Sequence, residues 1–372
     1  MRRGVCLAAA LAGLATSLPA LASSSGASSS GASSSGEAPA ASKPDAELKG
    51  VIRIYGFGMG GVVETWEQGF RALHPDVVFE NTLPTSDAAI PGLVTRVADL
   101  GVDGGEPALT EDLSFYETRG YHPSSLIVAS GAYDVEGRSN GPVVFVNSEN
   151  PLTKLTLDQL DGIFGSERTG GLRGFVWTPL EARGPDKNIR TWGQLGLKGK
   201  WADKPIQTYG HAASGTARFF QLKVLGNSDK WNPNYRGYVE TGSKQIAPED
   251  QAQRLGARSM LQGELAHDPY GVAWSIMSQA KGIKGIKAIA LAPRGGGAAV
   301  APTTESFRNR TYPLVRSIYI YFDRAPGAPL DPKLDAFLHY VLTPDAQAMT
   351  AAGGYLPLPE ATVREQLRSL AP

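Results

Sequence analysis

The chain has 372 residues, which is enough for a large core and for two domains. Charged residues make up 19% and hydrophobic residues 42%, as is typical of a soluble globular protein. Lys plus Arg and Asp plus Glu both number 36, so no basic excess points to nucleic acid as a partner. The single cysteine, Cys6, excludes an internal disulfide and a cysteine-ligated zinc site.

The N-terminus has the features of a secretory signal peptide. Arg2 and Arg3 precede an apolar run over residues 5–18, and residues 20–22 read A-L-A, a small-residue cleavage pattern. An uncleaved membrane anchor is the alternative, but the apolar run is short for a span. We therefore expect residues 1–22 to be removed on export. The mature chain would then lack cysteine, as is typical of proteins in the bacterial periplasm.

Residues 23–45 follow as a threefold SSSG repeat with an Ala- and Pro-containing tail. Such a composition has nothing to bury, so it predicts a flexible tether.

From about residue 46 strand-like and helix-like segments alternate, which predicts an α/β fold with largely parallel sheets. A helix is expected to carry Leu93, Val97 and Leu100 on one face, and another to begin at the N-cap Thr156 and end at Gly165. Residues 101–113 are expected to be a loop. The remaining expected helices cover residues 60–73, 217–225 and two segments around Pro344. The expected strands cover residues 51–55, 77–79, 126–130, 143–147, 206–209, 271–274, 286–291 and 318–322.

A glycine-rich turn follows the first expected strand. Gly56, Gly58 and Gly61 fit the dinucleotide-binding pattern G-x-G-x-x-G, and Glu80 lies near the position of a ribose-binding carboxylate. The same turn at a helix N-terminus could instead hold another anion, because free backbone N–H groups and the helix dipole favour negative charge. No catalytic His/Asp or Tyr/Lys constellation accompanies the motif. The anion loop is therefore the favoured interpretation, and a dinucleotide-dependent enzyme is a distant alternative.

A second strand–turn–helix junction has the sequence YGHAASGTARFF, residues 209–220. Ser214 and Thr216 add hydroxyl donors to the N-terminus of its helix. Two such junctions, well separated in the sequence, indicate two lobes that each present a helix end to a shared cleft.

Several segments together resemble the phosphate-binding proteins of ABC-type phosphate transporters, a family of periplasmic substrate-binding proteins. The match rests on the first glycine turn and its helix, an Asn-Pro-Leu segment, the Ser-Gly-Thr loop and the C-terminal helices. These segments are residues 52–80, 141–165, 192–220, 312–324 and 337–359.

The resemblance implies a type II periplasmic-binding-protein fold with two α/β lobes and a hinge of two crossing segments. Lobe I would comprise residues 48–142 and 310–372, and lobe II residues 143–309. It also implies a protein that is no enzyme and needs no cofactor. The chain would be a monomer that captures phosphate or a related oxyanion and delivers it to an ABC permease in the inner membrane. An exported binding or scaffold protein that has lost phosphate binding is the alternative.

The ligand-binding residues implied by the resemblance are Gly58, Met59, Gly60, Gly61, Ser86, Glu106, His211, Ser214, Gly215, Thr216 and Arg218. Three departures from the family pattern stand out. The first loop reads Met59-Gly60-Gly61 and has no Ser or Thr. The family's S-D-A-P, whose aspartate accepts a proton from hydrogen phosphate, is here V-D-G-G-E-P, so Glu106 or Asp103 would take that role. The family's arginine before Ser-Gly-Thr is missing, which leaves His211, Arg218 and Arg316 to supply positive charge.

The remaining histidines predict no metal site. His122 and His339 have no metal-ligand spacing, His74 is expected in a structural position at a helix end, and His267 is expected in a loop. No G-x-S-x-G motif supports a serine hydrolase.

Overall fold

The computed structural model describes residues 47–173, 175–212, 214–239 and 256–371. The expected signal peptide and tether lie outside these residues. Within them no helix is both long and apolar enough to cross a membrane. The described residues contain two five-stranded mixed sheets.

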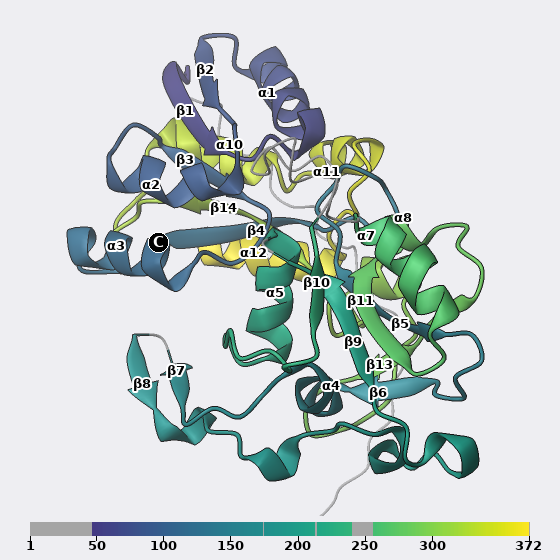
Figure 1. Cartoon of the computed structure of the whole chain (residues 1–372). Coiled ribbons are helices and arrows are strands. Elements are labelled where there is room, and N and C mark those ends of the chain that lie inside the picture. Colours follow the sequence, from purple (N-terminus) through teal and green to yellow (C-terminus); the bar gives the residue numbers. More distant parts are fainter. Residues whose placement is uncertain (1–46, 174, 213, 240–255, 372) are drawn as a thin grey trace, which may run out of the picture. The chain divides into compact units, whose positions relative to one another are not determined.

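The first sheet has the strand order β2-β1-β3-β14-β4 (Figure 1). β1 (Gly50–Gly56) pairs in parallel with β2 (Val77–Thr82) and β3 (Leu100–Asp103). β14 (Ser317–Phe322) is antiparallel to both β3 and β4 (Ser124–Ser130). β3 is buried along its whole length because it lies between β1 and β14.

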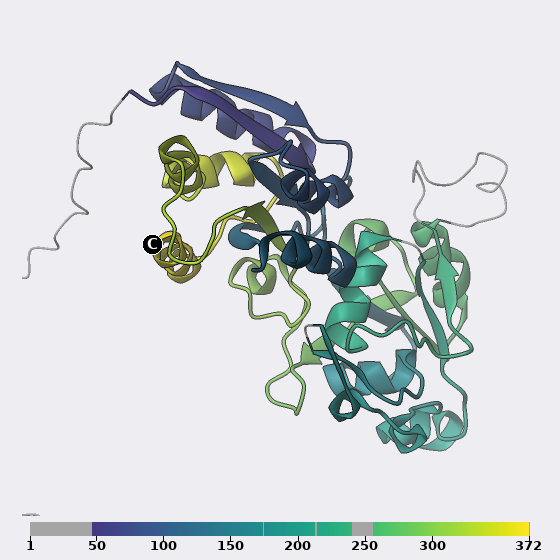
Figure 2. The same cartoon turned by 90° about the vertical axis from the view of Figure 1, so that its left-hand side faces the viewer.

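Helices cover both faces of this sheet, as Figure 2 shows. One core cluster joins its strands to α1 (Val62–Leu73), α10 (Pro332–Tyr340), α11 (Pro344–Ala352) and α12 (Glu360–Leu370). A smaller cluster packs α2 (Ala89–Val94) and α3 (Leu109–Arg119) against Tyr321 on the opposite face. The loop between β3 and α3 is thereby fixed at an end of the sheet.

The second sheet has the strand order β10-β9-β11-β5-β12. β9 (Gln207–His211) is parallel to β10 (Arg236–Tyr238) and β11 (Gly271–Ile276). β5 (Pro142–Asn147) is antiparallel to β11 and β12 (Ile286–Ala288). The core cluster of this second sheet includes residues of α4 (Leu157–Phe164) and α5 (Gly215–Val224).

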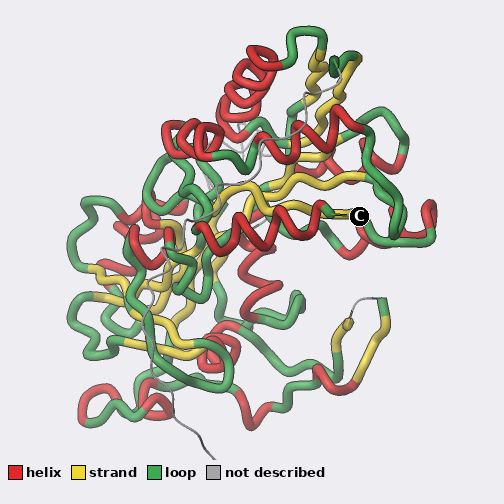
Figure 3. The backbone as a smooth tube through the Cα atoms, turned by 180° about the vertical axis from the view of Figure 1, so that it is seen from behind, coloured by secondary structure: helices red, strands yellow, loops and turns green. Residues whose placement is uncertain are grey.

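The remaining elements are short. β6 (Lys154–Thr156) pairs with β13 (Ala290–Ala292), and β7 (Gly171–Arg173) forms a hairpin with β8 (Val176–Thr178), seen in yellow in Figure 3. The short helices are α7 (Ala257–Ser259), α8 (Met277–Ala280) and α9 (Thr304–Arg308).

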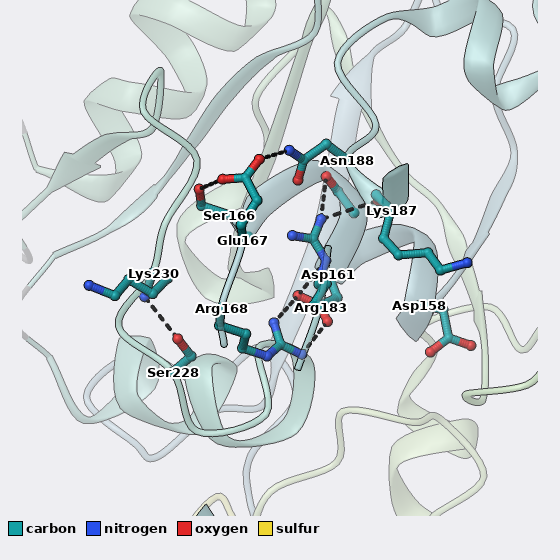
Figure 4. A network of polar contacts seen from close by, with 12 residues as sticks. Asp158, Asp161, Ser166, Glu167, Arg168, Arg183, Lys187, Asn188, Ser228 and Lys230 are labelled. Atoms are coloured by element: carbon teal, nitrogen blue, oxygen red, sulfur yellow. Dashed lines mark hydrogen bonds and ion pairs between the residues drawn. The ribbon is translucent and has the colours of Figure 1, made fainter. Parts of the chain in front are cut away.

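A buried carboxylate, Asp161 of α4, anchors the segment that carries this hairpin (Figure 4). Arg168 makes a bidentate pair with it, with N–O distances of 3.0 and 2.7 Å, and Arg183 lies 3.6 Å away. Arg190 caps the end of α4 by donating to the carbonyls of Gly162 and Gly165, where a cation suits the helix dipole.

Several expectations are wrong in detail. The helix expected through Leu93, Val97 and Leu100 ends at Val94, because Arg96 takes a left-handed conformation (φ 61°) and Leu100 begins β3. The loop expected over residues 101–113 contains the end of β3 and the start of α3.

The sheets are mixed and not largely parallel, since β14 and β5 run antiparallel to their neighbours. The strand expected over residues 286–291 is two strands, β12 and β13, in different sheets. The Thr156 N-cap is confirmed, with its hydroxyl accepting from the Gln159 N–H at 3.1 Å, and Gly165 is confirmed as the C-cap.

Candidate functional site

A cavity of about 1160 Å³ lies between residues of the two sheets. The first sheet contributes the turn before α2 and the loop from β3 to α3, and the second contributes the end of β9 and the start of α5. Predicted site residues on its lining are Ser86, Glu106, His211, Ser214, Gly215 and Arg218. Asp103 and Arg316, which the sequence offered as alternatives, line it as well.

The N-terminus of α5 opens into this cavity. Ser214 is the N-cap, and its Oγ accepts from the Ala217 N–H at 3.1 Å. The hydroxyl hydrogen of Ser214 remains available as a donor, together with N–H groups of the first helical turn. Because α5 has ten residues, its dipole adds partial positive charge at this end.

Arg316 brings a formal positive charge to the same place. It is buried, at 9% exposure, and its Nε donates to the Gly104 carbonyl. A Cβ atom built on Gly215 would lie 3.3 Å from Arg316 Nη2, so the guanidinium lies against the first residue of α5. Arg218, on the exposed side of α5, adds a second cation to the lining. The helix end and the arginines together make this part of the cavity attractive to an anion.

Asp103 lines the same cavity from the end of β3. Burial, with a smaller contribution from the nearby Glu111, raises the pKa of its carboxyl group to about 7, although Ser86, Arg316 and the Gly105 N–H oppose the shift. The Gly105 N–H donates to Oδ1 at 3.1 Å. Ser86 Oγ in turn accepts from the Gly104 N–H at 3.1 Å. The structure thus places a carboxyl group with a raised pKa on the wall of the cavity that Arg218 and Arg316 also line.

Glu106 is held differently. Its Oε1 accepts from Lys223 Nζ at 2.5 Å and lies 3.4 Å from the Tyr319 hydroxyl. Lys223 is on α5, so this pair joins the β3–α3 loop to the helix. The carboxylate charge of Glu106 is therefore largely balanced by a lysine.

His211 forms part of the cavity wall from within the core. It is fully buried at the end of β9, its Nε2 lies 2.9 Å from Ser275 Oγ, and its ring stacks on Trp274 at 4.9 Å. Its carbonyl accepts from the Tyr235 hydroxyl at 2.7 Å.

The remaining predicted ligand residues lie elsewhere. Gly58, Met59, Gly60 and Gly61 are not part of the cavity lining, and neither is Thr216, which is buried in α5. Met59 is fully buried with a left-handed backbone (φ 51°), and Gly60 faces the Arg138 guanidinium. A ligand role for these residues stays a prediction.

Sequence reasoning missed several lining residues, above all Trp231 and Tyr235. Their rings stack at 4.2 Å, and Trp231 also stacks on Phe220. The cluster of aromatic and turn residues in WNPNY, residues 231–235, was the signal that could have found them.

No group of His, Cys, Asp and Glu in the described ranges could hold a metal ion. His122, for example, contacts Asp112 at 2.9 Å and stacks on Phe175.

Comparison with known proteins assigns the fold. A family model described as a PBP superfamily domain matches residues 60–345, so the chain belongs to this superfamily. The fold is the type II periplasmic-binding-protein fold, as the sequence predicted.

Particular relatives are also similar over most of the chain. The phosphate-binding protein PstS of Pseudomonas aeruginosa strain PAO1 is 28% identical over 313 residues, which is 84% of each chain. PstS from Borrelia burgdorferi shares 14% identity with a TM-score of 0.54, over 84% of this chain and all of that one. An ABC-type phosphate transport receptor from Vibrio cholerae shares 19% identity with a TM-score of 0.50, over 83% of this chain and all of that one.

Proposed function

We propose that the protein is a solute-binding protein that captures hydrogen phosphate, or a closely related protonated oxyanion, in the cavity between the two sheets. The observation that carries this proposal is the convergence of the α5 N-terminus, Arg316 and Asp103 on one cavity. The similarity to phosphate-binding PstS supports it.

The helix end and the arginine would hold the oxygens of the anion. Ser214 and the N–H groups of the first turn donate to oxygens at one side, and Arg316 adds charge-assisted bonds. Ser86 supplies a hydroxyl from the opposite wall.

Asp103 would select for a proton on the ligand. As a carboxylate it can accept a hydrogen bond from the hydroxyl of hydrogen phosphate. Sulfate has no such proton at neutral pH, so its oxygen and the carboxylate would repel each other without a bond between them. Because Glu106 is balanced by Lys223, we assign this role to Asp103 and not to Glu106.

The two lobes would comprise residues 48–142 and 310–372 on one side and residues 143–309 on the other, and would close over the ligand by movement at the hinge. The protein would be exported to the periplasm and would act as a monomer that delivers the anion to an ABC permease. Such a receptor would catalyse no reaction and would need no cofactor.

Thermal unfolding tests the proposal. A ligand that binds only the folded chain raises the melting temperature by mass action, so phosphate should raise it and NADH should not. Replacing Ser214 by alanine should reduce the shift, whereas the matched Ser228→Ala change should not, since Ser228 caps a turn outside the cavity. No shift with phosphate, arsenate or sulfate would instead favour a binding or scaffold protein that has lost oxyanion binding. A shift with NADH alone would favour the dinucleotide enzyme.

A further inference from the structure

A second cavity, of about 430 Å³, shares Glu106 with the proposed phosphate site. Ser317 and Tyr319 of β14 line one side, and Leu157 of α4 and Lys223 of α5 line the other. Glu106 lines both cavities and separates them. Neither the sequence patterns nor the proposed function assigns a role to this second cavity.

Arg310 is the distinctive residue of this cavity. Its Nη1 donates to Ser130 Oγ at 2.8 Å and its Nη2 to Ser317 Oγ at 2.7 Å. In the described ranges no carboxylate lies at salt-bridge distance from it. Burial lowers the pKa of Arg310, but a guanidinium stays charged in any protein. A partly buried cation held only by neutral hydroxyls favours an anion nearby.

Glu106 and Glu365 act on Arg310 electrostatically, but among the described residues neither forms an ion pair with it. Glu106 and Lys223 form an ion pair at 2.5 Å and balance each other. Arg310 therefore has room for a direct ion pair with one negatively charged group of a ligand. A guanidinium has five N–H donors, of which the two serines use two, so donors remain for a ligand.

The rest of the lining is largely apolar and fits a carbon body. Its apolar members are Ile127, Leu157, Pro293, Pro313 and Val315. The volume lies within the range of small-molecule sites, which combine apolar walls with a few fixed polar groups.

We propose that this cavity is a second ligand site, which takes a small organic carboxylate with its acid group on Arg310 and its apolar body against Leu157 and Val315. The proposal does not depend on phosphate binding in the main cavity. Because Glu106 and Lys223 both line this cavity, an occupant would lie beside the residues that join the β3–α3 loop to α5.

Crystals of the protein soaked with 4-bromobenzoate test the site directly, with saturating phosphate present to fill the main cavity. The proposal predicts a bromine anomalous peak inside the second cavity, with the carboxylate on Arg310. A peak only elsewhere, or none, overturns it. This result is independent of whether phosphate itself binds.

Titration calorimetry with 4-bromobenzoate tests the role of the charge. Arg310→Gln should weaken binding about tenfold or more, the amount expected from losing a charge-assisted hydrogen bond. Arg308→Gln is the matched control, since Arg308 lies exposed on α9 and pairs with Glu305. If Arg310→Gln does not fold, Arg310→Lys keeps the charge and should retain part of the affinity. The assignment is overturned if wild type binds neutral 4-bromobenzamide as tightly as it binds 4-bromobenzoate. It is also overturned if Arg310→Gln binds 4-bromobenzoate as tightly as wild type does.

Discussion

Replacing Asp103 by asparagine should flatten the pH dependence of stability. Burial raises the pKa of this carboxyl from 3.8 to about 7 in the folded protein. Between these values the folded chain binds more protons than the unfolded chain, so the free energy of unfolding falls as pH rises. At about 1.36 kcal/mol for each pKa unit, the full loss is about 4 kcal/mol, of which roughly 3 kcal/mol falls between pH 5 and pH 8.

Urea unfolding of the wild type and Asp103→Asn in phosphate-free buffer measures this difference. Asparagine cannot ionise, so the free energy of unfolding of this variant should not fall with pH on account of residue 103. The variant should therefore gain stability relative to wild type between pH 5 and pH 8. Asp87→Asn is the matched control, because Asp87 lines the same cavity but is exposed. Parallel curves for wild type and Asp103→Asn would show that Asp103 does not titrate near neutral pH in the folded protein, and would refute the reasoning.

Further predictions concern the same site and its supports. Ser214→Ala should weaken phosphate binding by roughly 1–3 kcal/mol in calorimetry, because the anion loses a donor; unchanged affinity would argue against the helix-end site. Glu106→Gln should leave the rejection of sulfate intact, since Lys223 and not the ligand pairs with Glu106; loss of discrimination in a competition assay would return the role to Glu106. Asp161→Asn should lower the free energy of unfolding by about 3–5 kcal/mol, because Arg168 is left buried without its partner; a denaturation midpoint equal to that of wild type would contradict this.

Local sequence signals predicted individual elements well where one residue decides the outcome. Thr156 was recognised as an N-cap because a side-chain hydroxyl satisfies a free N–H at one position, and the structure confirms it. The Ser-Gly-Thr turn was likewise placed correctly at the start of α5. Such features depend only on near neighbours in the chain.

Other features depend on packing that the sequence does not show. Leu100 looked like a helical position because a four-residue buried strand has no periodicity of its own. In the sequence Glu106 is the favoured carboxylate and Asp103 only an alternative to it in the same expected loop. Only the sheet, which buries Asp103 between β1 and β14, and the Lys223 side chain, which neutralises Glu106, distinguish the two carboxylates.

The first glycine loop illustrates the same limit. A ligand role for its backbone donors stays a prediction, whereas the position of Gly60 beside the Arg138 guanidinium has no signal in the local sequence. The positions of side chains from distant segments, here residue 138, decide what such a loop can contact.

The most direct test of the account is titration calorimetry of phosphate and sulfate against wild type and Asp103→Asn at pH 8. The account predicts that the wild type binds phosphate and rejects sulfate, because Asp103 is mostly ionised there and accepts a hydrogen bond from the ligand's hydroxyl group. It also predicts that Asp103→Asn narrows the difference between the two anions, since an amide can donate to sulfate. Wild-type protein that binds neither anion, or binds both equally, would contradict it.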